Sequence, residues 1–148
     1  MSFPYKRILC PIDFDEFSAQ ALKEAAALAL SSGATLYVFH AVQINPLTSE
    51  GAIGGLGAGE LYDSQLQLAR TQIHQMMSEL PKQLTCQVIV QMGEAGPSII
   101  KQEIAVGADI VVMATHGRRG LKHLVLGSVA EKIVRESHVP VLTVRPTA

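Results

Sequence analysis

Residues 109–128 read DIVVMATHGRRGLKHLVLGS, and this stretch decides the fold of the chain. It opens with a continuous apolar run at residues 110–113, which is typical of a strand covered on both faces, as in a parallel sheet. The run ends in a polar, glycine-containing turn. The stretch closes on Gly127 and Ser128, directly before a segment with helical apolar spacing. A strand, a glycine turn and a helix in this order indicate an α/β fold.

Other apolar runs match further strands, and helical periodicity fills the gaps between them. With the run at 109–115, strands are predicted at residues 5–12, 35–42, 86–92 and 139–145. Helices are predicted at about residues 18–32, 66–80, 97–107 and 128–137, where apolar side chains recur every three or four residues. The alternation of strand and helix predicts an open parallel five-stranded sheet with right-handed crossovers and helices on both faces.

Residues 44–59 interrupt this alternation. They contain Pro46 and five glycines, whose spacing does not fit the GxGxxG pattern of a dinucleotide-binding turn. We interpret the segment as a flexible glycine-rich connector, and a lid over a ligand is the functional alternative.

The bulk composition limits the classes of function. Hydrophobic residues make up 48% of the 148-residue chain, charged residues make up 17%, and the formal net charge is −1. Such a chain buries one sizeable core and has no basic field to attract nucleic acid or anionic lipid. The amino terminus lacks a secretion-signal pattern, and no apolar run is long enough to span a membrane. We therefore expect a soluble cytoplasmic protein without nucleic-acid or membrane partners, whose Cys10 and Cys86 are reduced packing residues.

Polar residues follow the first and the fourth predicted strands. Asp13 comes after the first strand, and the turn after the fourth leads to the helix start at Gly127. Ligands of open parallel sheets bind at the carboxyl ends of the strands. There, glycine lets the backbone approach phosphate oxygens, and the free N–H groups of a helix start stabilise an anion. An alternative needs no ligand, because Ser128 and Glu131 match the Ser-x-x-Glu pattern of a capping box.

The segment from Met113 to Val144, MATHGRRGLKHLVLGSVAEKIVRESHVPVLTV, resembles the carboxyl-terminal signature of the universal stress protein family. In the ATP-binding branch of that family, the signature is a glycine, two residues, a second glycine, nine residues, and a glycine followed by serine or threonine. Gly117, nine intervening residues, and Gly127 followed by serine match this spacing. The opening PIDFDEFSAQAL, which begins at Pro11, is similar to the first loop and helix of the family, so the resemblance covers almost the whole chain.

The resemblance implies a flavodoxin-like or Rossmann-like strand order of 3-2-1-4-5 in a single domain over residues 1–148, with the loops after strands one and four side by side. It implies an adenine nucleotide, ATP or else ADP or AMP, as the ligand. Asp13 and the backbone near Ala41 would hold the ribose and adenine, and Gly117 and Gly127 would hold phosphates together with Ser128. The expected cofactor-binding residues are Pro11, Asp13, Ala41, Met113, Ala114, His116, Gly117, Arg118, Gly127 and Ser128.

Two positions depart from the family pattern. Ala114 replaces the first glycine of the signature, and because alanine is the smallest replacement we expect binding to survive. Asp15 stands where relatives often carry a small polar residue, so that two carboxylates, Asp13 and Asp15, lie near the expected phosphates. We hypothesise that a divalent cation such as Mg²⁺, carried by the nucleotide and contacting Asp13, offsets the repulsion.

The chain lacks the Walker sequence GxxxxGK[ST] and any convincing catalytic constellation, since its five histidines are scattered. We rank a nucleotide-binding regulatory protein of the stress response first, a weak ATPase or phosphotransferase second, and a dimeric scaffold without nucleotide third. The last strand, from Val139 to Arg145, is apolar and lies at a sheet edge in the implied topology, where it needs cover. Proteins of the family commonly pair this strand across a two-fold axis, so we expect a homodimer.

Overall fold

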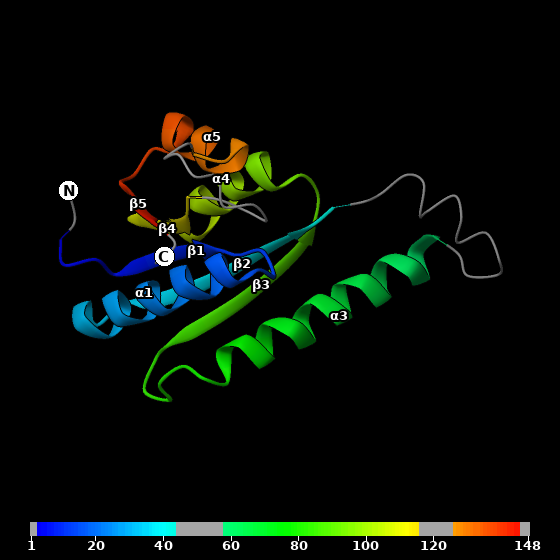
Figure 1. Ribbon diagram of the computed structural model, residues 1–148, viewed down its shortest axis with the longest axis horizontal. Coiled ribbons are helices and arrows are strands. Elements are labelled where there is room, and N and C mark those ends of the chain that lie inside the picture. The colour runs from blue at the N-terminus through cyan, green and yellow to red at the C-terminus, as the bar shows by residue number, and fades with distance from the viewer. Residues whose placement is uncertain (1–2, 44–57, 116–125, 146–148) are drawn as a thin grey trace.

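The computed structural model describes residues 3–43, 58–115 and 126–145 and contains a five-stranded sheet in the order β3-β2-β1-β4-β5 (Figure 1). All neighbouring strands of this sheet are parallel. The strands are β1 (Arg7–Pro11), β2 (Thr35–Val42), β3 (Cys86–Met92), β4 (Ile110–Ala114) and β5 (Val141–Val144). The expected parallel sheet and its strand order are confirmed.

Helices cover both faces of the sheet. Those within the described residues are α1 (Glu16–Ser32), α3 (Ala58–Met77), α4 (Ala95–Val106) and α5 (Ser128–Glu136). In Figure 1, α1 and α3 lie on one face, and α4 and α5 lie on the other. Within the described parts of the chain, none of these helices has the length and hydropathy that a bilayer-spanning segment requires.

The helices on the two faces explain why the strands read as unbroken apolar runs. In β1, Ile8 and Cys10 pack into the core beneath α1 and α3. Leu9, between them, points to the opposite core, which contains Ile99 of α4 and Ile133 of α5. All three β1 side chains are fully buried. A strand with both faces buried has no position for a polar side chain.

Helix starts differ from the expected ones by a few residues. The first helix begins at Glu16 because Asp15 caps it, rather than near Ser18. The second begins at Ala58, so the last two residues of the expected connector at 44–59 are helical, and its other residues lie outside the described ones. The third begins at Ala95 and takes Pro97 into its first turn, where a missing N–H costs no helical bond.

The last strand is shorter than the predicted 139–145 because residues before it bond elsewhere. The N–H of His138 donates to Glu103 Oε1 at 2.8 Å, and the N–H of Val139 donates to Ser137 Oγ at 3.3 Å. Pro140 has no N–H. The regular pairing of β5 with β4 therefore starts at Val141.

Candidate functional site

The carboxyl ends of β1 and β4 lie next to each other, as the family resemblance implied. The two strands pair in parallel, with Ile8 opposite Ile110 and Leu9 opposite Val111. Beyond β4, the N–H of Gly127 donates to the carbonyl oxygen of Thr115 at 2.8 Å. This bond joins the start of α5 to the end of β4, although eleven residues separate Thr115 from Gly127 along the chain.

The start of α5 differs from the predicted capping box. Gly127 is the N-cap with φ −60°, and no side chain caps this helix end within the described residues. Ser128 is the first helical residue, not the cap, and it is exposed. Glu131 instead pairs with Arg135 at 3.2 Å. The capping-box interpretation is therefore wrong. The first N–H groups of a helix have no acceptor within it, and those of α5 lie at the carboxyl edge of the sheet, beside the end of β4.

The two aspartates after β1 have different environments. Asp13 is exposed, and its Oδ1 accepts a hydrogen bond only from the neighbouring Phe14 N–H, at 3.0 Å, among the bonds of the described residues. Asp15 is the N-cap of α1: its Oδ1 accepts the N–H of Ser18 at 2.8 Å, and its Oδ2 is buried without a hydrogen-bond partner in the described chain. The expectation that both carboxylates face a ligand is thus wrong for Asp15, because its side chain caps the start of α1.

The other expected site residues fall into two groups. Pro11 and Met113 are buried at the ends of β1 and β4, beside the half-buried Ala114. Ala41 lies in β2, two residues beyond Phe39, which is paired with Pro11, so it extends past the end of β1. The structure thus gathers these positions, together with Asp13, Gly127 and Ser128, at one edge of the sheet. His116, Gly117 and Arg118 lie outside the described residues.

Two polar side chains at this edge were missed by the sequence analysis. In the sequence, Ser18 stands out only as part of a helix start, and His40 only as one of five scattered histidines. In the structure, the Ser18 hydroxyl accepts a hydrogen bond from the N–H of Asp13, and Nδ1 of His40 lies at hydrogen-bond distance from the carbonyl oxygen of Ile12. No local pattern could have identified His40, because its partner is the carbonyl of Ile12, 28 residues away.

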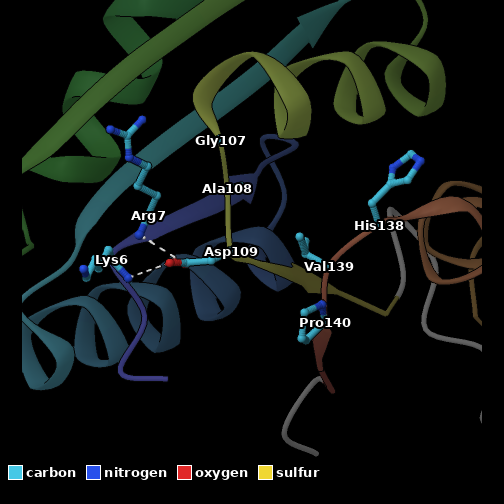
Figure 2. A pocket seen from close by; sticks show the side chains of 8 residues that line it. All are labelled: Lys6, Arg7, Gly107, Ala108, Asp109, His138, Val139 and Pro140. Carbon is cyan, nitrogen blue, oxygen red and sulfur yellow. Dashed lines mark hydrogen bonds between the residues drawn. The ribbon is translucent and has the colours of Figure 1, made fainter. Parts of the chain in front are cut away.

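A pocket of about 540 Å³ lies at the opposite, amino edge of the sheet (Figure 2). Its carboxylate, Asp109, accepts the backbone N–H groups of Lys6 and Arg7 at 2.8 and 3.1 Å. The guanidinium of Arg7 donates to the carbonyl of Val106 at 2.8 Å. Figure 2 shows the side chains of Lys6, Arg7 and His138 spread around the hollow rather than converging on it. This pocket has space for a ligand, but the Asp109 carboxylate and the Arg7 guanidinium that line it already form hydrogen bonds with the backbone.

Neither edge is arranged as a protein-only metal centre. Within residues 3–43, 58–115 and 126–145, no three His, Cys, Asp or Glu side chains are grouped so that they could hold an ion. The single exposed carboxylate of Asp13 would need further oxygen ligands from elsewhere to hold a cation.

Known proteins match the chain over nearly its whole length. The family model described as the universal stress protein family matches residues 4–145. Universal stress protein A homolog 2 of Coxiella burnetii is 34% identical over 143 residues, covering 95% of each chain. Universal stress protein MJ0577 of Methanocaldococcus jannaschii is 28% identical over 158 residues, covering 98% of each chain.

Solved structures show the same fold. The structure of MJ0577 superimposes with a TM-score of 0.82 over 97% of this chain and 98% of that one. A universal stress protein crystallised in complex with cAMP, 20% identical, has a TM-score of 0.61 over 95% of this chain and 96% of that one. The matching family model, the relatives over nearly the full length and the shared fold lead to one conclusion: the chain belongs to the universal stress protein family.

Proposed function

We propose that the protein binds an adenine nucleotide, ATP in the first place, at the carboxyl edge of its sheet, and that this binding serves a regulatory role in a stress response. The observation that supports the proposal most is the bond from Gly127 N–H to Thr115 O, at 2.8 Å. It joins the start of α5, which no side chain caps within the described residues, to the edge where Asp13 presents an exposed carboxylate. Donors for phosphate and an acceptor for ribose hydroxyls then lie at one edge.

Each expected residue has a role in this proposal. The backbone N–H groups that follow Gly127 in the first turn of α5 and the hydroxyl of Ser128 bind phosphate oxygens, together with Gly117, and the missing side chain of Gly127 leaves room for the phosphate. Asp13 and the backbone near Ala41 bind the ribose and adenine. Pro11, Met113 and Ala114 form the walls, and His116 and Arg118 are auxiliary donors. The cAMP complex of another universal stress protein is an instance of this family holding an adenine nucleotide.

The experiment that tests the proposal has two stages. Freshly purified protein is denatured, and the released small molecules are identified by mass spectrometry. The emptied protein is then titrated with ATP, ADP, AMP and cAMP by calorimetry. Two variants accompany the wild type: Gly127→Trp, whose backbone at φ −60° tolerates any side chain, and His138→Trp, which puts the same ring at the amino edge. We expect binding to be lost only in Gly127→Trp, and no binding by the wild type contradicts the proposal.

A bound nucleotide could bring Mg²⁺ with it, and the residues present fit that ion in part. Mg²⁺ keeps several waters and takes few protein ligands beside phosphate oxygens. Asp13 offers one exposed carboxylate, with Oδ1 bonded to Phe14 N–H. Asp15 contributes nothing of this kind, because its carboxylate caps α1. Nucleotide affinity that is the same with and without EDTA would remove the cation from the proposal.

We also propose that two copies of the chain pair through the strand β5. This strand lies at the edge of the sheet, and Leu142 on it is 44% exposed, with Val134 of α5 47% exposed. An apolar edge strand is a template for pairing with another chain. Sedimentation at micromolar concentration should give the mass of two chains for the wild type and of one chain for Leu142→Asp. A wild-type mass of one chain contradicts the dimer.

A further inference from the structure

The peptide unit between Ile12 and Asp13 is held at both of its polar groups by side chains. Its carbonyl oxygen, on Ile12, lies 2.8 Å from Nδ1 of His40 in β2. Its N–H, on Asp13, donates to Oγ of Ser18 in α1, also at 2.8 Å. One side chain comes from the neighbouring strand and the other from the following helix. Together they fix the plane of this peptide and hence the direction in which the Asp13 side chain leaves the backbone.

The contact with the carbonyl oxygen fixes the tautomer of His40. A carbonyl oxygen can only accept a hydrogen bond, so Nδ1 of His40 must carry a proton. The imidazole ring of His40 also packs against the ring of Phe14, the residue after Asp13. The ring centroids are 4.4 Å apart and the interplanar angle is 44°. His40 therefore contacts the residue before Asp13 and the residue after it.

Ser18 is itself fixed. The residue is 5% exposed, and its own N–H donates to Oδ1 of the cap residue Asp15 at 2.8 Å. The hydroxyl that accepts the Asp13 N–H thus sits in the first turn of α1, in a position that the helix cap determines. Ile12 adds a further anchor, since its N–H donates to the carbonyl of Phe39 at 2.8 Å.

The two bonds do more than satisfy polar groups. Ile12 is 6% exposed and both bonds to this peptide are partly buried, whereas Asp13 itself is exposed, so the buried clamp holds the backbone from which an exposed carboxylate extends. Two protein side chains in place of water hold the loop in one conformation before any ligand arrives. A pre-organised acceptor avoids the ordering cost that a floppy one would incur on binding.

We propose that His40 and Ser18 are positioning residues that clamp the Ile12–Asp13 peptide and so aim the Asp13 carboxylate at the nucleotide. This inference rests on the proposed nucleotide-binding function. Neither side chain needs to touch the ligand, because each acts through the backbone of Asp13.

The test uses the full-length protein and four variants. His40→Leu and Ser18→Ala each remove one side of the clamp. His40→Asn keeps a donor where Nδ1 stood, since the amide nitrogen of asparagine lies at the same distance from the backbone. His74→Leu, at an exposed histidine of α3, is the matched control. Three quantities are measured for each protein. Calorimetry gives the ATP affinity, urea denaturation gives the unfolding midpoint, and NMR gives the exchange rate of the Asp13 amide proton.

We expect His40→Leu and Ser18→Ala each to weaken ATP binding about tenfold, which corresponds to about 1.4 kcal/mol. His40→Asn should recover most of that loss, and His74→Leu should bind as the wild type does. The Asp13 amide should exchange faster in Ser18→Ala than in the wild type. A purely structural role would lower the urea midpoint without this pattern of loss and recovery in affinity.

Four results would overturn the inference. ATP affinity equal to that of the wild type in both clamp variants would do so while leaving the proposed function intact. Equal losses in His40→Asn and His40→Leu would show that the bond to Ile12 is not the cause. An Asp13 amide that exchanges equally fast with and without the Ser18 hydroxyl would show that the clamp is absent. If the wild type binds no nucleotide, the proposed function itself fails and this inference fails with it.

Discussion

The two edges of the sheet differ in what their polar groups are bonded to. At the amino edge a pocket of about 540 Å³ is open, yet Asp109 and the Arg7 guanidinium that line it are bonded to backbone groups. At the carboxyl edge, Asp13 is exposed and the start of α5 has no side-chain cap within the described residues. Specific binding depends on polar groups that are available to a ligand. If the site lies at the carboxyl edge, as we propose, then polar groups left without protein partners indicate a binding site better than the volume of a pocket does.

The largest effect is expected at Glu103, beside the amino edge. Its side chain is 2% exposed, and it accepts the Ser137 hydroxyl at 2.6 Å and the His138 N–H at 2.8 Å. Removing it in Glu103→Ala should lower the free energy of unfolding by about 3 kcal/mol, because two buried bonds to a charged group are lost. Urea denaturation measures this change. Glu103→Gln, which keeps one acceptor oxygen, is the control and should lose less.

If the comparison holds, Glu103→Ala leaves the ATP affinity of the folded protein unchanged. A loss of affinity in that variant would show that the two edges are coupled, and a loss of stability under about 1 kcal/mol would show that the buried bonds matter little.

The two aspartates at opposite edges should have opposite effects. Asp109→Ala removes the acceptor of two backbone N–H groups, which then bond to water. The free energy of unfolding should fall by about 1.5 kcal/mol, and the ATP affinity should not change. Asp13→Ala loses one local bond and should change stability by less than about 0.5 kcal/mol, while ATP affinity falls about tenfold. Urea denaturation and calorimetry on both variants check this. The reverse pattern would make the amino edge the binding site.

Glycines at the two edges are expected to matter for different reasons. Gly107, the C-cap of α4, has φ +65°, so Gly107→Ala strains the backbone and should cost about 1 kcal/mol of stability. Gly127 has φ −60°, which any residue adopts, so Gly127→Ala should keep the stability and lower ATP affinity through its added methyl group. Thermal unfolding and ATP titration of both variants separate the two effects. An unstable Gly127→Ala would mean that this glycine serves the fold.

The smallest effect at neutral pH concerns the thiol of Cys86, the first residue of β3, at the amino edge of the sheet. Burial raises the pKa of Cys86 from the usual 9.0 to about 11. Because the folded pKa lies above the unfolded one, the stabilisation is complete below about pH 9 and is lost as the pH rises toward 11. The urea midpoint should therefore fall above pH 9, and Cys86→Ala should reduce that fall. Identical pH profiles for both proteins would contradict the assignment.

Much of the fold was predictable because each element has a local signal. Continuous apolar runs marked the strands, since both faces of the sheet are buried, and Gly33 and Gly107 marked two helix ends in the left-handed conformation. Helix starts were harder. Both Gly127 and Ser128 can occupy an N-cap by local rules, and the bond from Gly127 N–H to Thr115 O accompanies the choice of Gly127.

The site was predictable only in part, for the same reason. The spacing of glycines and the family resemblance pointed to the carboxyl edge of the sheet, where we propose the site. They chose Asp13 as the binding residue, but they also placed Asp15, two residues away with the same chemistry, near the expected phosphates. What separates them is geometry: one carboxylate reaches the N–H of Ser18 and caps α1, and the other stays exposed.

By itself, the sequence determined the order of strands and helices, the parallel sheet and the family, because these depend on periodicity and spacing along the chain. Only the tertiary structure decided that Asp15 caps α1, that no side chain caps α5 within the described residues, and that His40 and Ser18 bond to the peptide before Asp13. The physical reason is that these features are hydrogen bonds formed after the chain has folded. The bond from His40 to Ile12 spans 28 residues, and the bond from Lys6 to Asp109 spans 103. No local pattern records such pairs.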